Sequence, residues 1–252
     1  MDYNKLKATI ETIAIEAGKK ILDIYENEDF SKTIDFKADD SPLTIADKAS
    51  HVIIDKALNE LNLNIPILSE EGVQPTYEER KQWTSFWCVD PLDGTKEFIN
   101  RNGEFTVNIA LIENGEPVLG VVYAPVTETM YTGAKGVGAF KNGKKIAVTK
   151  KESNRIAVRS KSHASPEEEV VLERYNVTDQ ISVGSSLKFC MVAEGKADLY
   201  YRHGPTMEWD TAAGQAVVEA AGGRIFHDNT ENKLFRYNKE NLLNGSFLCL
   251  GW

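Results

Sequence analysis

The 252-residue sequence predicts an α/β protein with an α+β N-terminal half and an α/β C-terminal half. Two patterns along the chain support this class. Strand-like runs follow one another over residues 105–148 with turns but no helices between them, as in an antiparallel sheet. After residue 155, short strands alternate with helical segments, as in α/β folds. The charged stretch 150–154 separates the two patterns, so we predict domains at 1–150 and 151–252.

The N-terminal half begins with a long amphipathic helix, predicted over 2–26 because apolar residues recur at steps of three and four. Its apolar stripe consists of Leu6, Ile10, Ile13, Ala14, Ala17, Ile21 and Ile24. A short strand and a turn-rich loop follow at 34–42, and a second helix is predicted over 43–61. The short strand 65–68 then leads into two adjacent glutamates.

The middle of the chain is rich in strands. An apolar, β-favouring strand at 86–89 is followed by a short helix at 96–99. The antiparallel strands are expected at 105–113, 117–124, 129–133, 136–140 and 146–148. In the second half we expect strands at 155–160, 180–183, 197–201 and 247–250. The helices between them are expected at 166–175, 185–194 and 208–221.

The bulk composition, with 42% hydrophobic and 27% charged residues, is that of a soluble globular protein. The net charge of −9 argues against nucleic acid or anionic membrane as a main partner, because either would require a basic face. Three cysteines without a CxxC motif indicate buried thiols in a reducing compartment. The N-terminus lacks a signal-peptide pattern, and no apolar run approaches the roughly 20 residues of a membrane span. We therefore expect a cytoplasmic protein without an integral membrane segment.

Two carboxylates three residues apart follow the strand at 86–89, within Asp90-Pro91-Leu92-Asp93-Gly94-Thr95. Such carboxylates suit Mg²⁺, and the backbone N–H groups that follow them could point at a phosphate. On its own, however, this stretch also fits a Pro-containing turn that ends in a helix-capping acid. The choice between a metal site and a turn therefore depends on acids elsewhere in the chain.

Three distant acids lie at comparable places. Asp47 lies in the first turns of the second predicted helix, Glu70 follows a predicted strand, and Asp210 opens the last predicted helix. Each one alone also fits a helix-dipole partner, a loop residue or an N-cap. Four of these acids, Glu70, Asp90, Asp93 and Asp210, lie at strand ends and helix starts, where α/β folds place their sites. Because four charges would not stay buried together without cations, the residues alone predict a magnesium site.

Three motifs resemble those of the inositol monophosphatase superfamily, the lithium-sensitive, magnesium-dependent phosphomonoesterases, and the resemblance covers essentially the whole chain. They are Ser69-Glu70-Glu71, Asp90-Pro91-Leu92-Asp93-Gly94-Thr95, and Trp209-Asp210 followed by Gly214 and Gly222-Gly223. Further segments resemble the bacterial 3′(2′),5′-bisphosphate nucleotidases of the CysQ type. These segments are 37–47, 96–99, 102–110, 160–163 and 184–190.

The resemblance implies a layered αβαβα sandwich of the inositol monophosphatase and fructose bisphosphatase type. It also implies a small phosphorylated nucleotide as substrate: adenosine 3′,5′-bisphosphate (PAP), hydrolysed to AMP and phosphate. The sulfated parent PAPS, converted to APS, is a further expected substrate, which places the activity in sulfur assimilation. The implied cofactor is Mg²⁺, as two or three ions, and Li⁺ should inhibit. Some family members associate peripherally with the inner membrane, which this acidic chain does not suggest.

The resemblance also assigns roles to single residues. The implied metal ligands are Glu70, Asp90, Asp93, Asp210 and the carbonyl oxygen of Leu92. Asp47 and Thr95 would orient and activate the attacking water, and the backbone of Gly94 and Thr95 would hold the scissile phosphate. The implied reaction is direct in-line attack of a metal-activated water on phosphorus, with no phosphoenzyme.

Substrate selection is expected in the second half of the chain. Ser185 and Lys188 lie three apart at a predicted helix start, so their side chains could share a face and meet a second phosphate. Arg202 offers a bidentate fork for an anion, and His163 matches a histidine that contacts base or ribose. Without the resemblance, a solvated lysine, a surface arginine and a loop histidine are the alternatives. The full set of expected substrate contacts is Glu70, Leu92, Asp93, Gly94, Thr95, His163, Ser185, Lys188, Arg202 and Asp210.

Two other functions remain open from the sequence. The first is an inositol monophosphatase-type sugar phosphatase, although a monophosphate would need no second anion site at Ser185 and Lys188. The second is a non-catalytic nucleotide sensor, although a pure binder could lose Asp47 or Thr95 without harm. The expected partner is a small molecule and not a nucleic acid, and the protein is expected to be a monomer or a homodimer.

Overall fold

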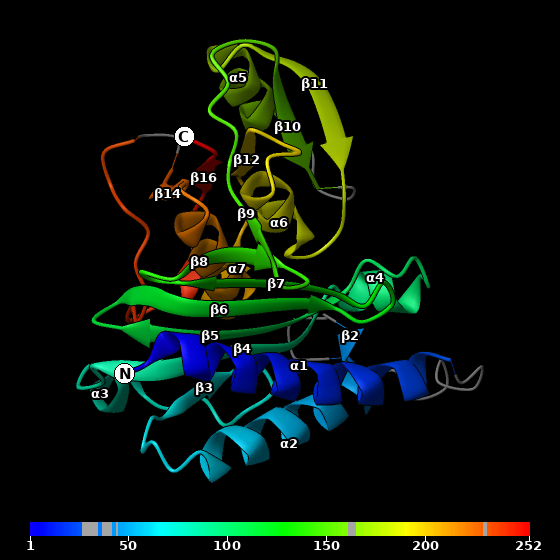
Figure 1. The fold of residues 1–252 in the computed structure, drawn as a ribbon, viewed down its shortest axis with the longest axis vertical. Helices are drawn as coiled ribbons and strands as arrows, with labels where there is room; N and C mark the ends of the chain where they lie inside the picture. Colours follow the sequence, from blue (N-terminus) through cyan, green and yellow to red (C-terminus); the bar gives the residue numbers. More distant parts are fainter. Residues whose placement is uncertain (27–34, 37–41, 44, 161–164, 229–230) are drawn as a thin grey trace.

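The computed structural model describes residues 1–26, 35–36, 42–43, 45–160, 165–228 and 231–252. These residues form five stacked layers in the order helices, sheet, helices, sheet, helix (Figure 1). The layered αβαβα sandwich expected from the resemblance is therefore confirmed. In the described part of the chain, no helix combines the length and the apolar character needed to cross a membrane.

The first layer consists of α1 (Tyr3–Tyr25) and α2 (Ile45–Glu60), which pack against each other beneath the larger sheet (Figure 1). The side chain of Asp2 caps α1 by accepting hydrogen bonds from the N–H groups of Asn4 and Lys5. The predicted apolar stripe turns toward the sheet and is buried at Ile10, Ile13, Ala14, Ala17 and Ile21. The helix predicted over 2–26 is confirmed to within one residue at each end.

The second layer is a seven-stranded sheet with strand order β3-β4-β5-β6-β7-β8-β9. Its strands are β3 (Ile67–Ser69), β4 (Ser85–Asp93), β5 (Thr106–Glu113), β6 (Glu116–Ala124), β7 (Thr129–Ala134), β8 (Gly138–Lys141) and β9 (Lys144–Ile146). All neighbours are antiparallel except β3 and β4, which are parallel. The predicted antiparallel strands are thus confirmed. Two short helices accompany the sheet: the unpredicted α3 (Tyr77–Arg80) before β4, and the predicted α4 (Thr95–Ile99) after it.

The middle layer contains α6 (Leu187–Ala193) and α7 (Glu208–Ala220). Helix α7 belongs to the second half of the chain but packs on β5, β6 and β7 of the first half. Its backbone approaches so closely that a Cβ atom added at Gly133 would lie 2.4 Å from the carbonyl oxygen of Ala216. Only glycine fits in β7 at this crossing, and α7 is thereby held tightly against the larger sheet.

The fourth layer is a five-stranded sheet with strand order β11-β10-β12-β16-β14. Its strands are β10 (Arg155–Arg159), β11 (Val177–Ser182), β12 (Leu199–Arg202), β14 (Arg224–His227) and β16 (Phe247–Leu250). The first three strands are parallel, whereas β16 runs antiparallel to both β12 and β14. Helix α5 (Pro166–Arg174) forms the outermost layer and contacts β11 and β12.

The sequence did not predict β14 or the small pair formed by β13 (Thr206–Met207) and β15 (Leu243–Asn244). The remaining pair joins β1 (Asp35–Phe36) to β2 (Pro42–Leu43). One hydrophobic cluster joins the two halves of the chain, with members such as Val122 on β6 and Val217 on α7. All three cysteines are free and buried, as predicted. The domain division at 150 stays a prediction.

Candidate active site

Strand β4 carries two of the candidate acids, and it runs further than predicted, through Asp93. Asp90 pairs with Asn108 of β5 and Asp93 with Thr106, so β4 contains one extra residue between these pairs. This is a β-bulge, which re-aims the side chains around it. The predicted end of the strand at residue 89 is therefore wrong, because the bulge accommodates the proline inside the strand.

Two hydrogen bonds hold the bulge in place. The hydroxyl of Ser50 on α2 donates to the carbonyl of Pro91 at 2.7 Å, and the N–H of Leu92 donates to Oδ1 of Asp90 at 3.0 Å. The side chain of Leu92 is buried in the core, so this residue can serve a site only through its backbone. Its role as a carbonyl ligand stays a prediction.

Three carboxylates meet where β3, β4 and α7 converge. Ligand atoms of Glu70, Asp90 and Asp210 all lie within 4.8 Å of one another. Burial, followed by the charges of Glu70 and Asp93, raises the pKa of Asp90 well above its usual value. Burial also raises the pKa of Asp210, where the charge of Asp93 is the next largest cause. Charge on Asp90 and Asp210 is thus disfavoured at these positions, and a bound cation would stabilise it.

The chemistry of this cluster fits a hard divalent cation. Its donors are all carboxylate oxygens, with no histidine or cysteine among them, and such donors favour Mg²⁺, Ca²⁺ or Mn²⁺ over zinc or copper. The first and last of the three acids, Glu70 and Asp210, are 140 residues apart in the sequence. Glu70 follows β3, Asp90 lies on β4 and Asp210 lies on α7. The structure therefore brings Glu70, Asp90 and Asp210 together as one possible metal site.

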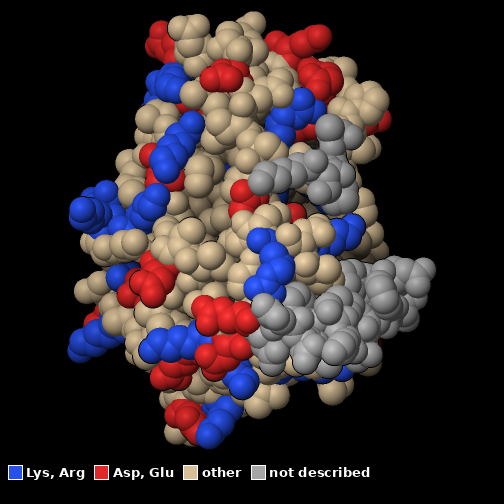
Figure 2. Space-filling view, turned by 90° about the vertical axis from the view of Figure 1, so that its right-hand side faces the viewer, with Lys and Arg blue, Asp and Glu red and all other residues tan. Residues whose placement is uncertain are grey.

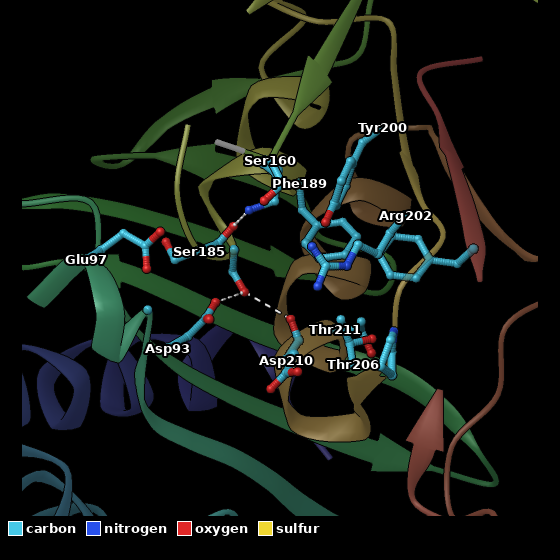
Figure 3. Close-up of a pocket in the computed structure, with 15 residues that line it drawn as sticks. Asp93, Glu97, Ser160, Ser185, Phe189, Tyr200, Arg202, Thr206, Asp210 and Thr211 are labelled. Atoms are coloured by element: carbon cyan, nitrogen blue, oxygen red, sulfur yellow. Dashed lines mark hydrogen bonds between the residues drawn. The ribbon is translucent and has the colours of Figure 1, made fainter. Parts of the chain in front are cut away.

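Asp93 lies beside this cluster and is held by two side chains that sequence reasoning missed. Its Oδ2 atom accepts hydrogen bonds from the hydroxyl of Ser186 at 2.6 Å and from Nδ2 of Asn108 at 3.3 Å. Nδ2 of Asn108 also donates to Oγ of Ser186 at 2.9 Å. The same Oγ lies 3.0 Å from the carbonyl oxygen of Asp210 (Figure 3). The buried Ser186 thus links the acid on β4 to the start of α7.

Asp47 and Thr95 lie in contact, as expected for two groups that act together. The hydroxyl of Thr95, the first residue of α4, lies 3.3 Å from Oδ1 of Asp47, which is buried in the first turn of α2. Gly94 precedes Thr95 and has a φ of 92°, a left-handed conformation that favours glycine. An added Cβ would also lie 3.2 Å from Cβ of Ser185. Gly94 therefore allows the β4–α4 connection to pass close to the segment before α6.

A pocket opens next to these residues, between the β4–α4 connection, α6, β12 and α7 (Figure 3). Six of the predicted site residues line it: Asp93, Gly94, Ser185, Lys188, Arg202 and Asp210. Residues that the sequence did not single out also line it: Glu97, Ser160, Ser186, Phe189, Tyr200, Pro205, Thr206, Thr211 and Phe247. The pocket therefore has acids on one side and two cationic side chains on the other.

Lys188 is a buried cation at the back of the pocket. Its ammonium donates to the carbonyl of Ser185 at 2.7 Å and lies 5.6 Å from the ring centre of Tyr200. Burial lowers its pKa to about 8, against the opposing effect of Asp93. Ser185 does not lie on the helix as predicted, because α6 begins only at Leu187 and Ser185 has a φ of 46°. The two residues meet instead because the lysine folds back onto the serine carbonyl.

Two further features complete the pocket. Oγ of Ser185 is buried and has no hydrogen-bond partner in the described part of the chain. Arg202 ends β12, and its Nε donates to the carbonyl of Gly204 at 3.3 Å while the guanidinium lies against the pocket (Figure 3). His163 lies outside the described residues. On the face seen in Figure 2, acidic and basic side chains are interspersed.

Comparison with known proteins gives consistent matches over nearly the whole chain. The profile of the Inositol monophosphatase family matches residues 2–248. The chain is 48% identical to the 3′(2′),5′-bisphosphate nucleotidase CysQ of Escherichia coli strain K12 over 241 residues, which are 93% of this chain and 95% of that protein. It is 35% identical to CysQ of Haemophilus influenzae over 248 residues, 95% of this chain and 90% of the relative.

Solved structures agree with these matches. The crystal structure of CysQ from Bacteroides thetaiotaomicron, a bacterial member of the inositol monophosphatase family, has a TM-score of 0.86 and 44% sequence identity, and covers 99% of this chain and 98% of that one. The suhB protein from Bartonella henselae has a TM-score of 0.82 at 24% identity, covering 98% of this chain and 94% of that one. The latter supports the fold alone.

Proposed function

Because the chain belongs to the inositol monophosphatase family, we propose that it is a magnesium-dependent 3′(2′),5′-bisphosphate nucleotidase. It hydrolyses PAP to AMP and phosphate and also accepts PAPS, which gives APS, within sulfur assimilation. One observation supports this most directly: Asp210 of the acid cluster and its neighbour Asp93 line the same pocket as two cationic side chains, Lys188 and Arg202. A substrate with two phosphates can place one at the acids, through metal, and the other at the cations.

The metal would be held by the acids that converge at the end of the larger sheet. Glu70, Asp90 and Asp210 would hold a first Mg²⁺, because their oxygens lie within 4.8 Å of one another. Asp93 and the carbonyl of Leu92 would supply further ligands, for two or three ions in total. When bound, Mg²⁺ lowers the pKa of a water molecule and offsets negative charge on the phosphoryl and leaving oxygens.

The chain's own residues would supply the proton transfer. The hydroxyl of Thr95 donates to the carboxylate of Asp47, which leaves a lone pair on Oγ1 able to accept a hydrogen bond from the attacking water. As that water attacks phosphorus, its proton can pass to Oγ1 while the hydroxyl proton passes to Asp47. The buried carboxylate is thus the final acceptor, and Thr95 fixes the direction of attack. The backbone of Gly94 and Thr95 is proposed to hold the scissile phosphate.

The choice of substrate would come from the other wall of the pocket. The ammonium of Lys188 and the guanidinium of Arg202 can pair with the second phosphate. Oγ of Ser185, buried and without a partner in the residues described, can add a hydrogen bond. An inositol monophosphate would leave these two cations without a phosphate partner, which favours a bisphosphate.

Initial rates on PAP, PAPS and inositol 1-phosphate in one Mg²⁺ buffer test this proposal. We expect PAP to have the highest kcat/KM of the three. Fast hydrolysis of inositol 1-phosphate without turnover of PAP would favour the sugar-phosphatase alternative instead. PAP binding without phosphate release, independent of Mg²⁺, would favour the sensor. The cytoplasmic location, the monomeric or homodimeric state and inhibition by Li⁺ stay predictions.

A further inference from the structure

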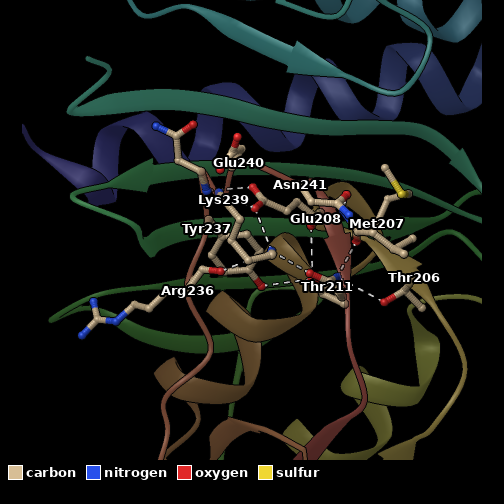
Figure 4. Close-up of polar contacts among 12 residues, drawn as sticks. Thr206, Met207, Glu208, Thr211, Arg236, Tyr237, Lys239, Glu240 and Asn241 are labelled. Carbon is tan, nitrogen blue, oxygen red and sulfur yellow. Dashed lines mark hydrogen bonds and ion pairs between the residues drawn. The ribbon is translucent and has the colours of Figure 1, made fainter. Parts of the chain in front are cut away.

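A second cluster of buried polar side chains lies behind Asp210, at the start of α7, and the proposed reaction does not use it (Figure 4). Its centre is Glu208, which is fully buried. The Glu208 carboxylate accepts hydrogen bonds from the N–H of Asn238 at 2.8 Å, the N–H of Lys239 at 2.9 Å and the ammonium of Lys239 at 2.7 Å. Glu208 and Lys239 therefore form a buried ion pair. It joins the loop that contains Asn238 and Lys239 to Glu208, the first residue of α7.

The ion pair reaches Asp210 through one amide side chain. The ammonium of Lys239 also donates to Oδ1 of Asn244 at 2.9 Å. Nδ2 of Asn244 donates in turn to the carbonyl of Met207 at 2.7 Å and lies 3.2 Å from Oγ1 of Thr211. The N–H of Met207 donates to Oδ2 of Asp210 at 2.8 Å. A continuous path of short contacts thus leads from the ion pair to a candidate metal ligand.

The same loop is also fastened to the connection between β3 and β4. The guanidinium of Arg80 donates to Oδ1 of Asn238 at 2.9 Å and to the carbonyl of Lys239 at 3.0 Å. Nδ2 of Asn238 donates back to the carbonyl of Arg80 at 2.7 Å. Arg80 is buried and ends α3, in the connection between β3 and β4, the strands that lead to Glu70 and Asp90. The loop therefore joins the start of α7, which carries Asp210, to the connection between the strands of Glu70 and Asp90.

The acid cluster needs such support because its members repel one another. The ligand atoms of Glu70, Asp90 and Asp210 lie within 4.8 Å of one another, so their negative charges repel. A frame that keeps them in place before metal arrives removes the cost of assembling them at the moment of binding. A buried ion pair is a weak source of stability compared with apolar residues of the same volume, so its value here lies in position.

We propose that Glu208, Lys239 and Asn244 are positioning residues, which set the place of Asp210 relative to Glu70 and Asp90 and thereby the affinity for the divalent cation. The inference rests on the proposed function only in that these acids hold metal. It assigns no contact between the three residues and the substrate. Their loss should weaken metal binding while the folded protein and its affinity for nucleotide at saturating metal stay close to those of the wild type.

Direct binding of Mn²⁺, measured without substrate by electron paramagnetic resonance, tests the proposal. For Lys239→Met we expect the Kd for Mn²⁺ to rise about 10-fold or more, as is typical when a group that orients a metal ligand is lost. Lys239→Arg should recover most of the affinity, because it keeps the charge. Lys135→Met is the matched control, since it breaks an ion pair with Glu116 whose side chains are 63% and 40% exposed.

Kinetics separate positioning from general loss of structure. In Lys239→Met the Mg²⁺ concentration for half-maximal rate should rise, whereas kcat and the KM for PAP at saturating Mg²⁺ should change little. A merely structural role would lower the folded fraction and kcat at every Mg²⁺ concentration. That result, or an unchanged Mn²⁺ Kd in folded Lys239→Met, overturns the proposal.

Asn244→Ala provides a second variant should Lys239→Met fail to fold. The change removes the contacts of this side chain with the ammonium of Lys239 and the carbonyl of Met207 while leaving the ion pair with Glu208 in place. We expect the Kd for Mn²⁺ to rise about threefold, as for the loss of one ordinary hydrogen bond; an unchanged Kd overturns the proposal. If the wild type binds Mn²⁺ but does not hydrolyse PAP, the proposed function fails while the positioning role still stands.

Discussion

Replacing Lys188 by methionine isolates the part of the pocket that is proposed to read the second phosphate. Methionine has a similar length and is compatible with the apolar surroundings of this buried side chain. The change removes the only charge that the side chain offers and leaves the metal-binding acids untouched. The carbonyl of Ser185 loses its 2.7 Å donor, so a small loss of stability is also expected.

The expected size follows from the type of contact. A hydrogen bond between a charged donor and an ionised acceptor contributes about 1.5–3 kcal/mol, which corresponds to roughly 10- to 100-fold in kcat/KM for PAP. A substrate without the second phosphate, such as 3′-AMP, makes no such contact, and its kcat/KM should change less than about threefold. The ratio of the two substrates is therefore the sensitive quantity.

The pH dependence of the KM for PAP should also depend on the charge of Lys188. Burial lowers the pKa of Lys188 to about 8, so the cation is present below pH 8 and is lost as the pH rises through that value. For the wild type, the KM for PAP relative to that for 3′-AMP should rise above pH 8, whereas in Lys188→Met the ratio should stay flat. An equal loss on both substrates, or the same pH profile in both proteins, would refute the assigned role.

Three other substitutions test separate parts of the site. Asp90→Asn should lower PAP turnover by several orders of magnitude with circular dichroism unchanged, and near-normal turnover would remove Asp90 from the metal site. Ser186→Ala removes the 2.6 Å donor to Asp93 and should weaken Mn²⁺ binding about 10-fold, whereas unchanged binding would make the contact incidental. Gly94→Ala places a Cβ at a φ of 92° and 3.2 Å from Ser185, so the free energy of unfolding from urea titration should fall by about 1–2 kcal/mol; an unchanged midpoint would show that the chain adapts.

Periodic and repetitive elements of the fold could be predicted from the sequence because their patterns are local. The stripe on α1 and the Asn-Gly turns of the antiparallel sheet are examples. The β13–β15 pair was missed because strands of two residues contain no pattern. The strand was expected to end before Pro91, because proline normally interrupts a ladder and no local pattern shows that a bulge will accommodate it.

The charged residues of the site could be predicted from their positions in the sequence and from the family resemblance. Acids at strand ends and helix starts indicated a metal site, and the structure places Glu70, Asp90 and Asp210 together. The supporting groups could not be found in this way. Asn108 is a polar residue between two apolar ones in β5, and its contact with Ser186 joins residues 78 positions apart. Such pairings depend on how the layers pack, which no local pattern encodes.

Release of phosphate from PAP, followed after removal and return of metal, tests the central claim most directly. The account predicts that chelation with EDTA abolishes release by the wild type and that added Mg²⁺ restores it, whereas Asp90→Asn stays inactive at the same Mg²⁺ concentration. Phosphate release that continues after chelation, or a wild type that releases none with Mg²⁺ present, would contradict it.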